Sequence, residues 1–313
     1  MTGVMATIPW YDGEAVARAT PMPALIAALQ RAFASGDYHA PPRLAADMDG
    51  ASLLVMPAWK GRERVGTKIV TVDPRARPSI QSTYILSDRA SGRPIAAIDG
   101  AMLTRRRTAA ASVLAASRLA RPASATLLAI GTGALNAPII EAYASAFALK
   151  NILVWGRDAD KAEAAASAAR ALGYPAAAIA TIEAGLAAAD IVTAATLATE
   201  PLIAGAALRP GMHIDLIGAF RPDMCEADAE SFARARVFVD THEGAMEEAG
   251  DLQQAIAAGA IRADAIEADL AALCSGSHPG RGDDDQAITL FKSVGTAIED
   301  MTAAELVVGD AAP

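Results

Sequence analysis

Two hydrophobic patterns divide the chain near Pro122. Residues 22–35, "MPALIAALQRAFAS", have the apolar spacing of an amphipathic helix that ends before Gly36. Three stretches, "ASLLVMPAWKG", "RVGTKIVTVDP" and "SIQSTYILSD", predict strands separated by Gly, Pro and Asp. Next, "DGAMLTRRRTAAASVLAASRLA" predicts a helix that Thr104 caps and Pro122 follows. Strands and helices that do not alternate predict a separate α+β domain.

Beyond Pro122, short apolar strands alternate with helical stretches. The strand-like segments are "ATLLAI", "NILVW", "ADIVTAAT", "GMHIDLIGA" and "RVFVD". This alternation predicts a Rossmann-type, doubly wound parallel sheet of the α/β class. The last segment, "AITLFKSVGTAIEDMTAAELVV", predicts a short strand or turn and then a helix that packs on the first domain. We therefore expect one domain from residues 1–120 with 290–313, and a second from residues 121–289.

Composition narrows the class of protein. Of the 313 residues, 53% are apolar, much of that alanine, and only 4% are aromatic, which predicts many closely packed helices. The net charge of −9 argues against a broad nucleic-acid-binding surface. The long apolar run 176–208 is interrupted by Glu183, Asp190 and Glu200, so we expect no membrane span.

Three further expectations concern the compartment, a signal peptide and metal binding. Two cysteines, Cys225 and Cys274, make no disulfide framework and fit a reducing cytosol. The segment "MTGVMATIPWYDGEA" lacks a basic stretch followed by an apolar one, so we expect no signal peptide and a cytoplasmic protein. The four histidines show no ligand spacing, and we expect no metal site.

The segment "LLAIGTGALNAPII", residues 127–140, predicts a dinucleotide-binding turn. It has a strand before it, a helix after it and a second strand ending about 24 residues further on. Gly131 permits the tight turn, and Gly133 lets a phosphate approach the backbone at the helix N-terminus. Asn136 replaces the third glycine, which eases packing of helix on strand and does not itself bind phosphate. The alternative is a purely structural glycine turn.

The end of the second strand of this domain, "VWGRD", bears on cofactor choice. A carboxylate directly after the strand would bind the ribose 2′-hydroxyl of NAD, but Gly156 stands there. Arg157 can pair with a 2′-phosphate, so NADP(H) is favoured over NAD(H). Asp158, one position on, keeps NAD(H) as the alternative.

Cations in the first domain are candidate ligands for an anionic substrate. Arg105, Arg106 and Arg107 lie near a predicted helix start; we expect Arg105 and Arg106 to be solvated, whereas Arg107 precedes a tightly packable run of small residues. There, bidentate capture of a carboxylate is feasible. Lys68 lies inside the apolar strand "GTKIVTV", and either it has a buried partner or it lies on an edge strand facing solvent.

A series of motifs then occurs in a fixed order along nearly the whole chain: "PPRL", "GTKIVTV", "LTRRRTAAAS", "GTGA", "GAFRPDM", "EAGDL" and "FKSVGTAIED". Together they resemble the ornithine cyclodeaminase/mu-crystallin family. The resemblance implies a Rossmann domain, a substrate-binding and dimerisation domain built from both chain ends, an active site between the two, and a homodimer.

The resemblance also implies a set of site residues. Catalytic roles fall to Lys68 and Arg107, and substrate binding to Arg43, Ser82 and Phe220. The residues implied to bind the cofactor, together with those predicted from the turn, are Gly131, Thr132, Gly133, Ala134, Leu135, Asn136, Arg157, Thr196, Val294 and Gly295.

One departure from the family pattern indicates the reaction. Ornithine cyclodeaminases carry an aspartate where this chain has Phe220, and a phenyl ring can neither act as a base nor bind an ammonium group. Asp223, three residues on, could substitute only in a differently folded loop. "GAFRPDM" is similar to members that reduce cyclic ketimines such as 1-pyrroline-2-carboxylate and 1-piperideine-2-carboxylate. The alternatives are an ornithine cyclodeaminase, an amino-acid dehydrogenase acting on a linear oxo acid with ammonia, and a non-catalytic NADPH-binding protein.

Overall fold

The chain is described by a computed structural model that covers residues 7–309. It divides into two compact units: unit 1 contains residues up to 107 together with those from 296, and unit 2 contains residues 108–295. The division falls inside a helix, at residues 107 and 108, rather than after it near residue 120. Residues 1–6, which begin the segment considered for a signal peptide, lie outside the described part.

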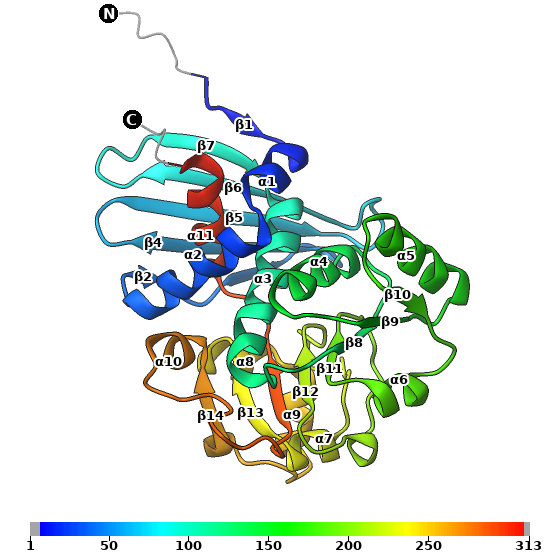
Figure 1. Cartoon of the computed structure of the whole chain (residues 1–313). Helices are drawn as coiled ribbons and strands as arrows, with labels where there is room; N and C mark the ends of the chain where they lie inside the picture. The colour runs from blue at the N-terminus through cyan, green and yellow to red at the C-terminus, as the bar shows by residue number, and fades with distance from the viewer. Residues whose placement is uncertain (1–6, 310–313) are drawn as a thin grey trace, which may run out of the picture. The chain divides into compact units, whose positions relative to one another are not determined.

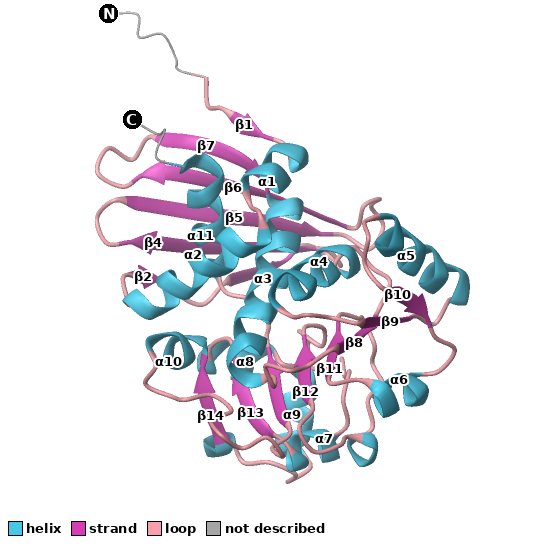
Figure 2. Cartoon of the chain, in the orientation of Figure 1, coloured by secondary structure: helices cyan, strands magenta, loops and turns pink. Residues whose placement is uncertain are grey.

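Unit 1 combines a largely antiparallel sheet with helices from both ends of the chain (Figures 1 and 2). Its strands run in the order β1-β7-β6-β5-β4-β2, and β3 also pairs with β4. Its elements are β1 (Trp10–Tyr11), α1 (Gly13–Ala19), α2 (Met22–Ser35), β2 (Tyr38–His39), β3 (Leu44–Asp47), β4 (Ser52–Lys60), β5 (Arg64–Val72), β6 (Ile80–Asp88), β7 (Pro94–Asp99), the first part of α3 (Gly100–Leu119) and α11 (Ala297–Val308).

The alternating pattern of β4, β5 and β6 separates the two faces of this sheet. On one face Met56, Lys68, Tyr84 and Ile98 lie side by side in register, all buried. Helix α11 packs on this face against β4, β5 and β6, and α2 packs against α11. The three predicted strands are therefore confirmed, and β7, which the sequence did not predict, completes the buried row.

The opposite face of the sheet is apolar and carries exposed side chains. One row across it is Leu44, Val55, Ile69 and Thr83, and Trp10 lies beside Ala97 in the next row. Leu44, Ile69 and Trp10 are 60%, 43% and 56% exposed, which is unusual for large apolar residues on one face.

Helix α3 begins earlier than the sequence predicted. Its first residue is Gly100, and the side chain of Asp99 accepts a hydrogen bond from the Met102 amide at 2.6 Å. The prediction that Thr104 caps this helix is wrong, because Asp99 already satisfies an N-terminal amide. The three arginines consequently lie in the second turn, where cations oppose the helix dipole less.

Unit 2 is a doubly wound parallel sheet with helices on its faces (Figure 2). All its strand pairs are parallel, in the order β10-β9-β8-β11-β12-β15-β13-β14. Its elements are the rest of α3, β8 (Thr126–Ile130), α4 (Asn136–Ala146), β9 (Asn151–Trp155), α5 (Ala159–Ala171), β10 (Ala176–Ala178), α6 (Ile182–Ala188), β11 (Ile191–Ala194), η1 (Gly205–Ala207), β12 (His213–Leu216), α7 (Ala229–Arg234), β13 (Arg236–Val239), α8 (His242–Glu248), α9 (Gly250–Ala257), η2 (Ala263–Ala265), β14 (Ile266–Asp269), α10 (Leu270–Ser275) and β15 (Thr289–Lys292).

The core of unit 2 explains the apolar strands that the sequence shows. Leu128, Val192, Ile214 and Leu290 lie in one register row across β8, β11, β12 and β15, and each is fully buried. Full burial of each such side chain contributes roughly 1.5–3 kcal/mol. The strand order reverses direction between β8 and β11, which is where ligands bind in this fold, at the carboxyl ends of the strands. The predicted Rossmann-type fold class is confirmed.

Candidate functional site

Lys68 lies in the middle of the unit 1 sheet, on the helix-covered face. It is 2% exposed, and its Nζ is 2.7 Å from Oδ2 of Asp300 and 3.4 Å from Oγ1 of Thr104. The alternative of an edge-strand lysine facing solvent is wrong, because β5 pairs with strands on both sides. An ammonium in such a place needs a counter-charge, and Asp300 of α11 supplies it.

Arg107 of α3 shares this counter-charge. Its Nε donates to Oδ1 of Asp300 at 3.0 Å and its Nη1 donates to Oε2 of Glu299. All three residues are at most 5% exposed. Both acids lie in the motif "FKSVGTAIED", but the sequence pattern alone assigns neither of them a role. The signal in the sequence was a pair of carboxylates in the first turn of a mostly apolar helix. The helix dipole favours acids at this position even when they have no partner.

The electrostatic balance of this group leaves Lys68 easy to deprotonate. Burial lowers the pKa of Lys68 to about 8, Asp300 opposes the shift, and Arg107 and Arg43 add to it. For Asp300, burial acts to raise the pKa, but Arg107 and Lys68 outweigh burial and hold the pKa below its ordinary value. Arg43, half-buried before β3, is thus close enough to Lys68 to act on its charge.

Two further residues that the sequence analysis considered, Ser82 and Arg106, also lie in unit 1. Ser82 of β6 is half-buried on the same sheet face as Lys68, one register row away, and the backbone of Gly100 packs against it so closely that a Cβ would lie 2.6 Å from its Oγ. Arg106 was expected to be solvated, and this prediction is wrong. It is 6% exposed, and its Nη2 donates to the Thr20 carbonyl at 2.5 Å.

The glycine turn of unit 2 has the shape that a pyrophosphate requires. Gly131 has φ +114° and approaches the Ala195 carbonyl so closely that a Cβ would lie 2.6 Å from its oxygen. A Cβ on Gly133 would meet nothing within 4 Å, so this side of the turn is open. Asn136 is the first residue of α4, and its Nδ2 donates to the Gly131 carbonyl at 2.8 Å. The residues therefore fit a dinucleotide, and Asn136 braces the turn from inside.

The end of β9 presents a cation and an acid with different surroundings. Asp158 caps α5, accepting from the Lys161 amide at 3.1 Å, and its other oxygen is 3.6 Å from Lys161 Nζ. Arg157 is exposed. Gly156 packs on Thr132 of the glycine turn, where a Cβ would lie 2.7 Å from Cγ2. No carboxylate directly follows the strand.

The remaining predicted residues lie in loops at the carboxyl ends of β11, β12 and β15. Thr196 follows β11, and both its amide and its hydroxyl donate to Glu226, at 2.6 and 2.9 Å. The amides of Val294 and Gly295, after β15, donate to Asp240 at 2.8 and 2.6 Å. These carboxylates hold loops that the family resemblance implies for nicotinamide binding, and neither acid was found by sequence reasoning.

Phe220 follows β12 and is 39% exposed. Asp223, the one nearby acid considered as a substitute for an aspartate at that position, makes two hydrogen bonds with Arg221, each 3.0 Å. This exposed pair holds the Asp223 carboxylate away from a role as a free base.

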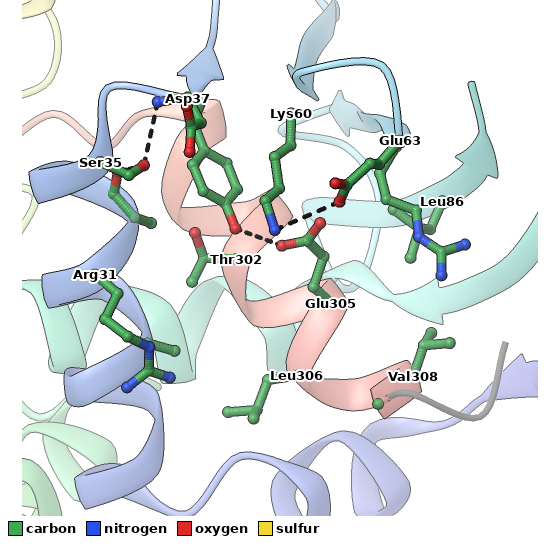
Figure 3. A pocket seen from close by; sticks show the side chains of 15 residues that line it. Arg31, Ser35, Asp37, Lys60, Glu63, Leu86, Thr302, Glu305, Leu306 and Val308 are labelled. Carbon is green, nitrogen blue, oxygen red and sulfur yellow. Dashed lines mark hydrogen bonds and ion pairs between the residues drawn. The ribbon is translucent and has the colours of Figure 1, made fainter. Parts of the chain in front are cut away.

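A cavity of about 610 Å³ lies elsewhere in unit 1, between α2, the β4–β5 turn and the end of α11 (Figure 3). Inside it, the hydroxyl of Tyr38 donates to Glu305 at 2.6 Å, and Lys60 Nζ is 3.6 Å from Glu63. Lys68, Arg107 and Asp300 do not line this cavity. Three cations and three acids line it, so it has no excess charge to select a ligand; they are Arg31, Lys60, Arg64, Asp37, Glu63 and Glu305.

The two units together define a class of protein: a dinucleotide-binding domain joined to a domain that buries a cluster of cations. The chain belongs to the ornithine cyclodeaminase/mu-crystallin family, whose pattern matches residues 12–312. It is 38% identical over 255 residues to a Delta(1)-pyrroline-2-carboxylate reductase of Paracoccus denitrificans, covering 80% of each chain.

Solved structures show the same fold. The Delta(1)-pyrroline-2-carboxylate reductase of Thermococcus litoralis, in complex with NADH and L-proline, has a TM-score of 0.91 at 29% identity over 96% of both chains. An archaeal alanine dehydrogenase dimer with bound NAD has a TM-score of 0.89 at 27% identity over 96% of both chains. The predicted family is confirmed, and the predicted ketimine reductase activity agrees with the relatives' names. Among residues 7–309, no helix is long and apolar enough to cross a membrane.

Proposed function

We propose that this protein reduces cyclic ketimines, 1-pyrroline-2-carboxylate to L-proline and 1-piperideine-2-carboxylate to L-pipecolate, with a nicotinamide cofactor. The observation that carries the proposal is the charge of the buried group in unit 1. Lys68 and Arg107 pair there with two acids, Asp300 and Glu299, and a third cation, Arg43, acts on the charge of Lys68. With Lys68 protonated, the group has one positive charge in excess, which matches the single carboxylate of such a substrate.

In this proposal the two units have separate tasks. Arg107 and Arg43 bind the substrate carboxylate, and Ser82 and Phe220 contact the ring. When bound at the Gly131–Asn136 turn, the reduced cofactor supplies a hydride to C2 of the imine. Lys68 holds a proton that it can donate to the imine nitrogen, because a pKa near 8 makes the ammonium a usable acid at neutral pH.

The Phe220 loop supports reduction over ammonia loss. Expulsion of ammonia from ornithine needs a base or an ammonium-binding carboxylate at this place, and the loop offers a phenyl ring. Asp223 is engaged by Arg221, which lowers the pKa of Asp223 and makes it a weaker base.

One assay tests the proposal against its rivals. The purified protein is mixed with NADPH and 1-pyrroline-2-carboxylate, and loss of the reduced cofactor's absorbance is followed. Rapid oxidation with formation of L-proline is expected. Ammonia release from ornithine without added reductant would instead identify a cyclodeaminase. Oxidation of NADPH only in the presence of pyruvate and ammonia would identify an amino-acid dehydrogenase. Cofactor binding without turnover would identify a non-catalytic protein.

The cofactor preferred in this proposal is NADP(H). Arg157 directly follows Gly156 at the end of β9, and Asp158 is occupied by the N-terminus of α5 and by Lys161. An arginine in this place can pair with a 2′-phosphate, whereas an engaged carboxylate is poorly placed to bind a ribose hydroxyl.

A homodimer in the cytoplasm completes the proposal. The open face of the unit 1 sheet presents Trp10, Leu44 and Ile69 to solvent, and a second copy is the partner that would cover this face. The related archaeal alanine dehydrogenase is a dimer. Both cysteines, Cys225 and Cys274, are buried free thiols, which suits a reducing compartment.

A further inference from the structure

Gly218, two residues before Phe220, is held from both sides by buried ionisable side chains. Its amide donates to Oε2 of Glu226 at 2.7 Å, and its carbonyl accepts from Nζ of Lys292. A Cβ on Gly218 would lie 2.4 Å from Oε1 of Glu226 and 2.4 Å from the Thr196 carbonyl oxygen. This glycine therefore fits tightly against both the carboxylate and the neighbouring loop.

The two ionisable groups are themselves deep in unit 2. Glu226 and Lys292 are fully buried, and Lys292 Nζ lies 3.4 Å from Oδ1 of Asp251, which is 1% exposed. Burial raises the pKa of Glu226 to about 7, and Lys292 opposes that shift. Burial of Glu226, Lys292 and Asp251 costs desolvation energy, and buried ion pairs contribute little to stability. We therefore expect these residues to fix the positions of other groups.

The residue between Gly218 and Phe220 has a strained backbone. Ala219 has φ +52°, in the left-handed region that residues with a Cβ seldom adopt. Its carbonyl accepts from the Gly250 amide at 2.8 Å, at the start of α9. A Cβ on Gly250 would lie 2.1 Å from the Arg221 carbonyl oxygen, so the loop wraps closely around this helix end. Backbone strain of this kind persists only where surrounding contacts fix the chain, and it clusters at functional sites.

Glu226 also reaches the loop after β11. Its Oε1 accepts from the amide and hydroxyl of Thr196, while its Oε2 accepts from Gly218. One carboxylate thus fixes two loops, at the ends of adjacent strands β11 and β12, relative to each other. A carboxylate suits this place because each of its oxygens faces a backbone N–H, of Thr196 or of Gly218, which can only donate.

We propose that Glu226 and Lys292 are positioning residues that hold the Gly218–Ala219–Phe220 segment and the Thr196 loop in one fixed arrangement. The inference deepens the proposed function, on which it rests for the role of Phe220 as a wall of the substrate ring site and of Thr196 as a cofactor contact. Through these loops, Glu226 sets the fit of the substrate without touching it.

The first test measures loop order directly and needs no substrate. Glu226→Gln keeps one acceptor oxygen and replaces the other by an NH₂ that faces a donor, so either the Thr196 amide or the Gly218 amide loses its acceptor and the side chain no longer ties the two loops together. Hydrogen exchange of peptides covering residues 194–198 and 217–225 should become about tenfold faster or more, with other core peptides unchanged. Glu230→Gln is the matched control, because Glu230 is exposed on α7 and its ion pair with Arg234, at 3.8 Å, is a weak surface contact.

The second test separates positioning from stability. In Glu226→Gln the KM for 1-pyrroline-2-carboxylate should rise about tenfold, with a smaller change in kcat, as expected when binding contacts loosen. If Glu226→Gln does not fold, Thr196→Ala removes one hydrogen bond to Glu226 and should still quicken exchange in residues 217–225.

Two outcomes would overturn the inference. Exchange in these two peptides equal to wild type would show that Glu226 does not order them. A uniform loss of protection and of Tm, with an unchanged KM, would make Glu226 a purely structural residue. Failure of the wild-type protein to reduce the imine would refute the proposed function alone, because the exchange experiment does not depend on turnover.

Discussion

The ammonium of Lys68 lies 2.7 Å from the carboxylate of Asp300, and Arg107 binds the other oxygen of the same carboxylate. Asp300 therefore fixes the distance between the two cations that the proposed reaction uses. Because neither cation reaches solvent appreciably, their charges act on a bound anion with little screening by salt.

The pKa of Lys68 predicts that the activity depends on pH. Its pKa is about 8, against an ordinary value of 10.5, so it is charged below pH 8 and neutral above. If the ammonium is needed, kcat/KM for imine reduction should fall as the pH rises through about 8. Lys68→Arg, which stays charged, should shift the fall to higher pH, whereas Lys68→Met should lower kcat/KM at every pH. A Lys68→Met variant with wild-type kcat and KM would refute any role for this side chain.

Arg107 and Arg105 form a matched pair on one helix. Arg107→Lys keeps the charge but loses the planar donors that bind two carboxylates, so the KM for the imine should rise roughly tenfold to a hundredfold. Arg105→Lys should leave steady-state kinetics unchanged, because Arg105 is half-buried and has no role in the proposed site. An equal response of the two variants would contradict carboxylate binding by Arg107.

Arg157 should decide between the two cofactors. Arg157→Ser removes the partner proposed for the 2′-phosphate and should raise the KM for NADPH about tenfold, with the KM for NADH nearly unchanged. The NADH measurement on the same variant is its own control for general damage. Wild-type protein that already prefers NADH would refute the assignment.

The strain at Ala219 should be measurable as stability. Ala219→Gly removes a Cβ from a left-handed residue and should stabilise the protein by about 0.5–1 kcal/mol in denaturant unfolding. Ala164→Gly, at an exposed position inside α5, should destabilise by about the same amount, because glycine weakens a helix interior. Because the Ala219 methyl is fully buried, destabilisation by Ala219→Gly would mean that its packing outweighs the relief of backbone strain, contrary to this prediction.

The exposed face of the unit 1 sheet, with Trp10, Leu44 and Ile69, should determine whether the protein forms a dimer. We expect wild-type protein to elute as a dimer in size-exclusion chromatography with light scattering, and Ile69→Asp to yield monomers, because a charge would be buried in the interface. Ile80→Asp is the control, since Ile80 is 51% exposed but belongs to the register row of the other sheet face. A monomeric wild-type protein at micromolar concentration would end the dimer proposal.

Local patterns predicted most of the elements. Apolar stretches separated by Gly, Pro and Asp predicted β4, β5 and β6, and the turn from Gly131 to Asn136 was visible because its residues are consecutive. The sequence did not predict β7 because this strand has only 6 residues, begins with a proline and leads directly into α3 without a turn between them.

Partnerships across long sequence separations were not predictable. Arg107 meets Asp300 across 193 positions, and Arg106 meets Thr20 across 86, so no local spacing signals either contact. Glu226, in "MCEADA", belongs to no short motif, and its role follows from three donors that only the folded loops bring together.

The use of both chain ends in unit 1 has a consequence for biosynthesis. During translation, the strand that carries Lys68 leaves the ribosome long before α11 is made. Lys68 and Arg107 therefore lack their counter-ion, Asp300, until all of unit 2 has been synthesised. Until the final helix docks, covering the sheet face that carries Lys68 would bury two uncompensated charges. We therefore expect the nascent amino-terminal segment to remain incompletely folded until α11 is made. A stop codon shortly before α11 should yield a product that chaperones and proteases recognise.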